Sequence, residues 1–199
     1  MNLENAKLFY IISCVFLGFV ILAPALFAVA PLPGGESFSE LWILGENHVL
    51  GSGTLNVLIN TPYTVYLGVS NHMGSLEYYT VYVKLRSQAQ AFQENGTPEP
   101  SSLESIFQYR LFLENNETWE KDFTFSFEKV SFEQNESRVS LLSINDNNVS
   151  VDTTGVRDES DGGFYYQLAF ELWIYNSTTS AFQYHDRYVS LWLKLINTP

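Results

Sequence analysis

Three histidines and one acidic turn are the residues of this 199-residue chain whose types could support metal or acid–base chemistry. His48, His72 and His185 are far apart in the sequence and show no His-Glu-x-x-His or His-x-His spacing. Metal sites need several ligands that converge, commonly histidine together with a carboxylate. We therefore predict no metal site, and we expect His72 and His185, each beside an expected turn, to hydrogen-bond to backbone groups.

The acidic turn at residues 158–163 is rich in oxygen atoms, and Asp146 and Asp152 lie near it in the sequence. Calcium favours loops of this composition. The order of ligands found in EF-hands is missing, however. The sequence therefore favours a solvated acidic loop and leaves a calcium site as the alternative.

Catalytic sequence patterns are missing: there is no Gly-x-Ser-x-Gly elbow, no P-loop and no Rossmann glycine run. The one cysteine, Cys14, lies in an apolar run, so the rest of the chain has no disulfide and no cysteine nucleophile. We therefore predict a protein that is not an enzyme and needs no cofactor. The formal net charge of −12 also argues against nucleic-acid binding, because phosphates need clustered lysine and arginine.

Residues 8–30 contain no charged side chain and would form about 34 Å of helix, enough to cross a hydrocarbon core of about 30 Å. Lys7 is the only basic residue before this run, and basic residues favour the cytoplasmic side. We expect residues 1–7 in the cytoplasm, residues 8–30 as a transmembrane anchor in membrane lipid, residues 31–36 as a linker and residues 37–199 as an extracellular domain. A cleaved signal peptide is the alternative, because residues 28–30 have the small-x-small pattern of a cleavage site.

Beyond the linker, apolar and polar residues alternate as they do in half-buried strands. The alternating segments begin with the one marked by Phe38, Leu41 and Ile43 and continue at residues 63–69, 79–86, 107–114, 123–128, 139–144, 165–175 and 187–196. Long polar loops are expected at residues 88–105 and 145–163. The pattern predicts an all-β fold, an immunoglobulin-like antiparallel β-sandwich preceded by one N-terminal transmembrane α-helix, although the Cys–Trp–Cys pattern of true immunoglobulin domains is missing.

Five Asn-x-Ser/Thr triplets lie in the expected outer domain, in polar stretches between apolar runs: Asn95, Asn116, Asn135, Asn148 and Asn176. They predict N-glycosylation of a surface protein. Unmodified loop asparagines are the alternative.

The two closing strands are apolar or aromatic on both faces. Their alternation directs Trp173, Tyr175, Tyr188 and Trp192 away from the core. An antiparallel sheet normally shows water one polar face, so these aromatic residues are covered or form an interface. The sequence leaves three covers open: the protein's own long loops or the Trp42 segment, a protein partner, or a stacked sugar.

Several motifs together resemble a known family. They are FSELWILG at 38–45, VSNH at 69–72, YTVYV at 79–83, FELWIYN at 170–176, YHDR at 184–187 and SLWL at 190–193. Over most of residues 36–196 the chain resembles the predominantly archaeal membrane-protein family labelled domain of unknown function 1616. The resemblance implies an archaeal cell-envelope setting and no established reaction. Many members carry several membrane helices before this domain, and often an acidic residue where this chain has Met73.

These observations predict a non-catalytic, single-pass protein of the cell membrane. Its extracellular β-sandwich would act as an accessory, stalk or assembly subunit of an archaeal cell-envelope or membrane protein complex, with Trp173, Tyr175, Tyr188 and Trp192 as the partner-binding patch. The alternative is an extracellular glycan-binding module that uses the same aromatic side chains as stacking platforms.

Overall fold

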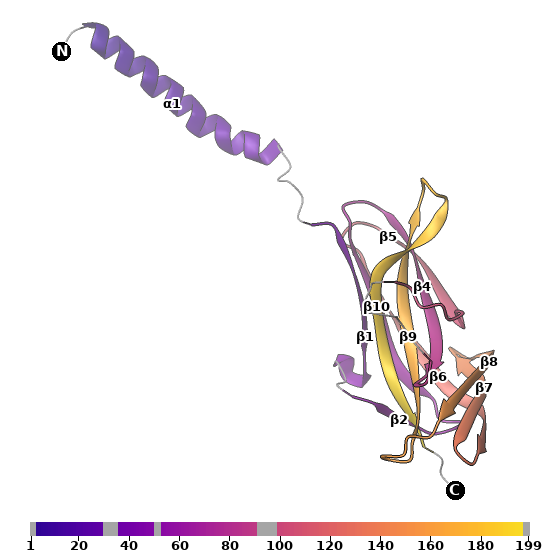
Figure 1. The fold of residues 1–199 in the computed structure, drawn as a ribbon. Helices are drawn as coiled ribbons and strands as arrows, with labels where there is room; N and C mark the ends of the chain where they lie inside the picture. Colours follow the sequence, from indigo (N-terminus) through magenta and orange to yellow (C-terminus); the bar gives the residue numbers. More distant parts are fainter. Residues whose placement is uncertain (1–2, 30–35, 50–52, 91–98, 197–199) are drawn as a thin grey trace. The chain divides into compact units, whose positions relative to one another are not determined.

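The computed structural model describes residues 3–29, 36–49, 53–90 and 99–196. They belong to two compact units, of which the first ends at Ser37 and the second begins at Phe38 (Figure 1). The first unit contains the helix α1 (Leu3–Val29). The second contains β1 (Phe38–Leu44), the short 3-10 helix η1 (Glu46–His48), β2 (Leu55–Val57), β3 (Tyr63–His72), β4 (Glu77–Ser87), β5 (Phe107–Leu113), β6 (Thr118–Glu133), β7 (Glu136–Ile144), β8 (Asn147–Val156), β9 (Phe164–Asn176) and β10 (Ala181–Leu195).

In helix α1 the structure describes the side chains of residues 7–20 and 22, and apolar ones are exposed on all sides of this part of the helix. Leu8, Phe9, Tyr10, Ile11 and Ile12 are five consecutive residues, and each is at least 58% exposed. Successive helical residues turn by about 100°, so this apolar surface runs round the whole helix. Within the described residues, no helix meets the combined requirement of length and apolar character for a membrane span.

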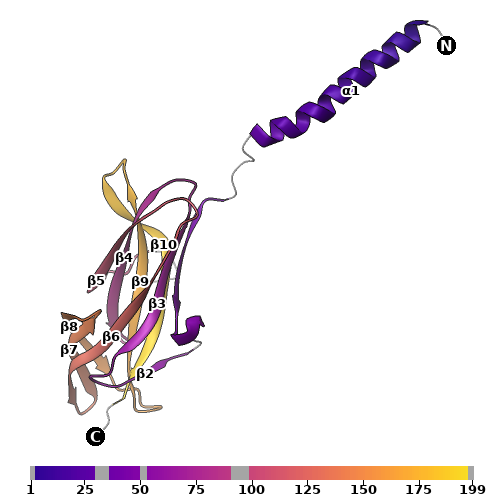
Figure 2. The same cartoon turned by 180° about the vertical axis from the view of Figure 1, so that it is seen from behind.

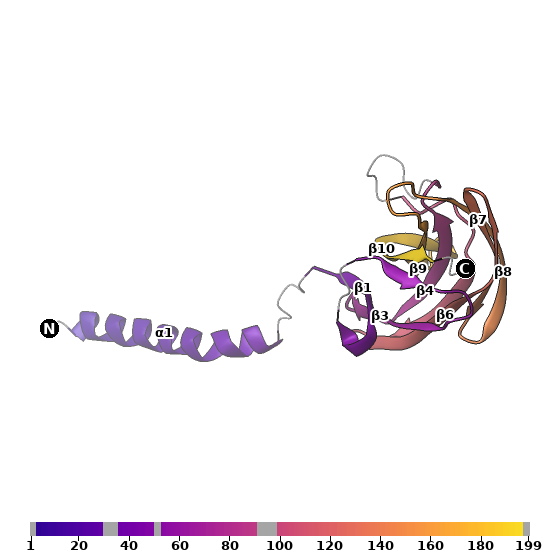
Figure 3. The ribbon, with the colours of Figure 1, turned by 90° about the horizontal axis from the view of Figure 1, so that it is seen from below.

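The second unit is a sandwich of two five-stranded sheets, shown from behind in Figure 2 and from below in Figure 3. The first sheet has the order β1-β3-β6-β7-β8, and the second has the order β2-β10-β9-β4-β5. Neighbouring strands are antiparallel except β2, which pairs in parallel with the end of β10. The predicted all-β sandwich is therefore confirmed, with one parallel pair that the sequence did not indicate.

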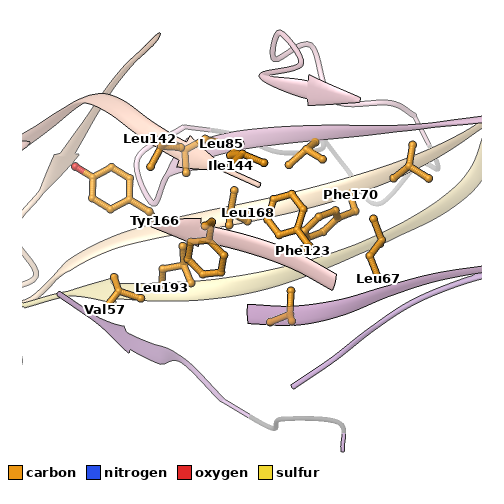
Figure 4. Close-up of a cluster of buried hydrophobic side chains, with 14 of the residues drawn as sticks. Val57, Leu67, Leu85, Phe123, Leu142, Ile144, Tyr166, Leu168, Phe170 and Leu193 are labelled. Atoms are coloured by element: carbon orange, nitrogen blue, oxygen red, sulfur yellow. The ribbon is translucent and has the colours of Figure 1, made fainter. Parts of the chain in front are cut away.

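The core lies between the two sheets and is made by the alternate residues that each strand directs inward (Figure 4). Phe123 of β6 and Phe170 of β9 meet edge to face across the sandwich, with ring centroids 5.0 Å apart. Leu67, Leu168 and Leu193 belong to the same buried cluster and have almost no exposed surface. Burying each such side chain is worth about 1.5–3 kcal/mol, so this packing holds the domain together without a disulfide.

One expected loop is wrong. Residues 147–156 of the stretch predicted as the loop 145–163 form β8, which pairs with β7 and closes the first sheet. Val149 and Val151 pack against the core, and their alternation was hidden among asparagine and aspartate residues. In the other expected loop, the described residues 88–90 and 99–105 contain no helix or strand, and residues 91–98 lie outside the described residues, as does most of the predicted linker.

The end of the sandwich at which β1 begins is called the entry end here. The register places Phe38, the first residue of β1, opposite His72, the last residue of β3. Strands β5 and β9 also end there, and β4 and β10 begin there (Figure 1). The opposite end, where β6 ends, β9 begins and β10 ends, is called the far end.

Candidate functional site: the outer face of the second sheet

A row of four aromatic side chains crosses the outer face of the second sheet near the entry end. Phe112 of β5 lies opposite Tyr78 of β4, and Phe182 of β10 lies opposite Tyr175 of β9. Because Tyr79 pairs with Ile174, Tyr78 and Tyr175 are also cross-strand neighbours. These four residues, one from each of four adjacent strands, are called the aromatic row.

The rings of the aromatic row are in continuous contact. Phe112 and Tyr78 are stacked almost parallel, with centroids 4.1 Å apart. Tyr78 lies 5.9 Å from Tyr175 and 4.9 Å from Phe182, and Tyr175 lies 5.4 Å from Phe182. Cross-strand aromatic pairs each contribute about 0.2–1 kcal/mol, so the rings hold one another in place.

The aromatic row is open to solvent: Phe112 is 66% exposed and Tyr175 is 37% exposed. Phe38 and Leu76 are exposed at the same end of the sandwich. Seven large hydrophobic side chains are exposed in the described β-domain, and these four are all at its entry end. Clustered apolar exposure of this kind marks interaction surfaces.

The centre of the same face holds a buried ion pair. Lys84 Nζ lies 2.8 Å from Glu171 Oε2, and the two side chains are only 6% and 1% exposed. Ser101 covers the pair: its backbone N–H donates to Glu171 Oε1 at 2.8 Å, and its carbonyl accepts from Lys84 Nζ at 2.7 Å. Residues 99–105 therefore form part of the cover that the sequence left open.

The indole of Trp173 borders this ion pair and is partly buried. Its Nε1–H donates to Glu171 Oε2 at 3.2 Å, and the rings of Tyr82 and Tyr184 meet it at 5.5 and 5.9 Å. Trp42, the other predicted cover, lies in the first sheet instead and donates its Nε1–H to Glu120 Oε2 at 3.0 Å. Trp173 is thus covered in part by Tyr82 of β4 and Tyr184 of β10, the two strands that flank β9.

Trp192 lies further along the same face, beside Arg86. The guanidinium of Arg86 lies 5.0 Å from the centre of the indole, within the range of a cation–π contact. Burial lowers the pKa of Arg86. Tyr188 of β10 lies between Trp192 of the same strand and Trp173 of β9 along this face, and its side chain is 44% exposed.

The four aromatic residues predicted from the sequence therefore share one face without forming one cluster. Trp192 pairs with Gln167, whereas Tyr175 lies eight residues further along β9, which corresponds to about 27 Å of strand. Only Tyr175 belongs to the aromatic row. Phe112 was visible as an apolar residue out of phase with Leu111 and Leu113, but no sequence signal placed it beside Tyr175.

His185 belongs to a buried hydrogen-bond network that connects the two sheets at the entry end. Its Nε2 lies 3.0 Å from Ser39 Oγ of β1, which lies 2.7 Å from Tyr79 OH of β4. The Tyr79 hydroxyl also donates to Asn71 Oδ1 at 3.1 Å. Burial, and secondarily Arg187, lowers the pKa of His185, which favours a neutral ring.

His72 lies on the outer surface of the first sheet. Its Nδ1 lies 3.0 Å from Asn116 Oδ1 and its Nε2 lies 2.9 Å from Ser70 Oγ, while its ring stacks on Phe38 at 4.7 Å. The expectation of backbone partners is wrong for both His72 and His185, since each contacts side chains. In the described part of the chain, no three His, Cys, Asp or Glu side chains converge to hold a metal ion.

The carboxylates of the acidic turn are engaged within the chain. Asp158 Oδ1 accepts the backbone N–H of Ser160 at 2.8 Å. Asp161 Oδ2 lies 2.7 Å from Lys194 Nζ and also accepts the hydroxyl of Tyr165. These donors, Lys194 first, hold the pKa of Asp161 at about 2. The turn is thus organised by its own hydrogen bonds and by the ion pair of Asp161 with Lys194.

The predicted glycosylation sites lie at different places on the domain. Asn116 and Asn135 lie in the turns before and after β6, Asn148 is the second residue of β8 and Asn176 is the last residue of β9. Asn95 lies outside the described residues. Their modification stays a prediction.

Comparison with known proteins identifies the family. The model of the family "Domain of unknown function (DUF1616)" matches residues 32–192, the range that contains the entry-end network and both sheets except the last three residues of β10. The chain belongs to this family. The resemblance stated from the sequence motifs is therefore confirmed. No curated protein matches the chain.

Solved structures resemble this DUF1616 domain only remotely. The CARDB domain of a Pyrococcus furiosus protein, in complex with di-metal ions, is 9% identical with a TM-score of 0.41, over 84% of this chain and 95% of that one. The ASH/PapD-like domain of human CEP192 is 12% identical with a TM-score of 0.33, over 86% of this chain and 94% of that one. A β-glucosidase from Listeria innocua in complex with gluconolactone is 10% identical with a TM-score of 0.33, over 80% of this chain and 16% of that one. These likenesses carry no information about function.

Proposed function

We propose that the protein is a non-catalytic, single-pass surface protein of the cell membrane whose β-sandwich docks onto a membrane-embedded protein. It would serve as an accessory, stalk or assembly subunit of an archaeal cell-envelope complex. The aromatic row is the observation that carries this proposal, because it is an exposed aromatic surface whose rings contact one another across four strands.

The anchor in this proposal is the charge-free run at residues 8–30. Two observations support it: the chain from Leu3 to Val29 forms one helix, and the described side chains of that helix are apolar on all its sides. Lys7 favours a cytoplasmic N-terminus, and the β-domain is then extracellular.

The length of the linker limits how far the first residue of β1 can lie from the end of the proposed anchor. Seven residues, 31–37, separate Ala30 from Phe38, and an extended chain spans at most about 3.6 Å per residue, or about 25 Å here. The linker therefore holds the β-domain within a limited distance of a membrane-embedded partner. Tethering also raises the effective concentration of a weakly binding surface.

The aromatic row has the properties of an interface centre. Binding energy concentrates in a few residues, often aromatic ones, that become fully desolvated on docking. Here four rings are held on strands by mutual contacts, so little conformational freedom is lost when a partner covers them.

Site-specific photo-crosslinking in native membranes tests the docking surface. A photoreactive phenylalanine analogue replaces Phe112 in the row or, as a control, Tyr188, which lies on the same face and is also exposed. We expect a discrete adduct with a membrane protein from position 112, its loss when Tyr175 is changed to Ser, and no such adduct from position 188. Equal adducts from both positions, or none from position 112, would refute the proposal.

The anchor is tested separately by the mass and accessibility of the mature chain. We expect the full-length mass in the membrane fraction and protease access to the β-domain from outside the cell. A mature chain that begins at Pro31 would show a cleaved signal peptide instead.

A further inference from the structure

The far end of the sandwich contains a cavity of about 420 Å³. It lies between the end of β6, the acidic turn before β9 and the end of β10. Its lining includes Phe132, Gln134, Arg157, Asp161, Phe164 and Lys194. Small-molecule sites typically have volumes of about 300–1,000 Å³ and combine aromatic walls with a few polar groups. We propose that this cavity binds a neutral sugar residue of a surface carbohydrate.

The apolar part of the cavity suits the C–H face of a sugar ring. Phe132 and Phe164 lie with their ring centroids 5.4 Å apart and their planes inclined by 50°. Phe164 is almost fully buried, whereas Phe132 keeps part of its ring exposed. The positive C–H groups of a sugar are attracted to the negative face of an aromatic ring.

The polar part of the cavity has hydrogen-bonding groups that remain available. Arg157 donates its Nε–H to the carbonyl of Gly162 at 3.2 Å. Among the described residues, neither the Nη groups of Arg157 nor the side-chain amide of Gln134 makes a hydrogen bond. A hydroxyl-rich ligand can pair with such groups, since each hydroxyl both donates and accepts.

The charges around the cavity favour a neutral ligand over an anion. Arg157 and Lys194 contribute two positive charges, and Asp161 and Glu133 contribute two negative charges. Lys194 is already paired with Asp161, with Nζ and Oδ2 2.7 Å apart. With that pair set aside, Arg157 and Glu133 leave one charge of each sign, so an anionic ligand meets no net positive charge.

The walls of the cavity are fixed without a ligand. The acidic turn is closed by two backbone hydrogen bonds of 2.8 Å between Asp158 and residues 162–163, and Arg157 N donates to Asn135 O at 2.9 Å. A Cβ at Gly163 would come within 2.4 Å of Lys194 Cε, so glycine lets the lysine stem pass. Preformed walls lower the entropic cost of binding.

Binding is measured on the full chain in a phosphocholine detergent, because sugar-based detergents would compete. The protein is produced without N-glycans, so that no sugar on Asn135, whose carbonyl accepts the Arg157 N–H, can occupy the cavity. A glycan array with neutral and uronate-containing oligosaccharides supplies the probes, and titration calorimetry measures the affinity for each neutral glycan that binds.

We expect Arg157→Gln and Phe132→Ala to weaken the binding of a neutral glycan at least tenfold. Arg138→Gln is the matched control, because Arg138 is an exposed arginine of β7 that pairs with Asp152 and does not line the cavity. It should leave the affinity unchanged. Since Arg157 is exposed, its variant keeps the test valid if Phe132→Ala fails to fold.

Three results would overturn the inference: no neutral glycan bound at millimolar concentration, preference for uronate-containing glycans, or equal affinity in Arg157→Gln and the parent protein. The aromatic row lies at the other end of the sandwich, so loss of docking in row variants and loss of sugar binding in cavity variants are distinguishable.

Discussion

The buried ion pair on the outer face makes a quantitative prediction. Among the residues that the structure describes, Lys84 is the one cation within hydrogen-bonding distance of the Glu171 carboxylate, and Lys84→Met removes it. The carboxylate is 1% exposed and keeps two donors, the Ser101 N–H and the Trp173 indole N–H. Removing one partner of a buried ion pair costs about 3–5 kcal/mol, because the remaining charge is left desolvated. We therefore expect the free energy of unfolding to fall by about that amount.

The double variant Lys84→Met/Glu171→Leu should be more stable than Lys84→Met alone. It removes both charges together and leaves only neutral groups, chiefly those of Ser101, without their partners. A neutral buried orphan costs about 1–3 kcal/mol. Because the pair is buried, the double variant should lose less free energy of unfolding than the sum of the losses of the two single variants.

Urea unfolding of the full chain, followed by tryptophan emission, measures these differences. The four tryptophans at positions 42, 119, 173 and 192 all lie in the β-domain, so the helix contributes no signal. Arg138→Met is the matched control, since Arg138 and Asp152 form an ion pair with both side chains at least 60% exposed. Water solvates the remaining charge of such an exposed pair, so the urea midpoint should move much less in Arg138→Met than in Lys84→Met. Equal midpoints for Lys84→Met and Arg138→Met, or purely additive costs in the double variant, would refute the reasoning.

Three further predictions concern the entry end and the first sheet. The pKa of His185 is lower in the folded than in the unfolded protein, so the unfolded chain binds more protons below about pH 6.5 and stability falls as the pH drops. His185→Gln should therefore reduce the change in melting temperature between pH 7 and 5, and an unchanged pH dependence would contradict this. Gly68→Ala would place a Cβ 2.0 Å from Trp42 Cε2 and should cost about 1–3 kcal/mol with a change in tryptophan emission, whereas a neutral effect in urea unfolding would show that the indole moves freely. Asn71→Ala removes a hydrogen-bond partner from the Leu113 carbonyl, the Met73 N–H and the Tyr79 hydroxyl, of which the last keeps Ser39, and should lower the free energy of urea unfolding by about 3 kcal/mol; a loss near zero would mean that water replaces the lost partner.

The strands were predictable where alternation was strict, and the aromatic row was not predictable at all. Phe123, Phe125 and Phe127 alternate with polar residues, and all three are buried in β6. The aromatic row depends on which strands are neighbours and on their register, and a shift of one residue would turn Tyr78 or Tyr175 to the other face. One sequence contains no measure of that register.

The ion pair was hidden for a related reason. Lys84 and Glu171 each read as a polar residue on the solvent face of an alternating strand. Only the antiparallel pairing of β4 with β9 brings them together, and the irregular segment around Ser101 helps to remove them from water. Burial by an irregular segment leaves no periodic pattern in the sequence.

The placement of β1 determines how the domain would respond to mechanical load. Seven consecutive residue pairs join β1 to β3, from Phe38 opposite His72 to Leu44 opposite Tyr66. A pull on the chain before Phe38, resisted at the far end, acts along β1, whereas the hydrogen bonds between antiparallel strands are perpendicular to it. The bonds are then strained in shear and must fail together instead of opening one by one. A surface protein held at both ends would tolerate stretching through this joint, and shortening β1 would lower its rupture force.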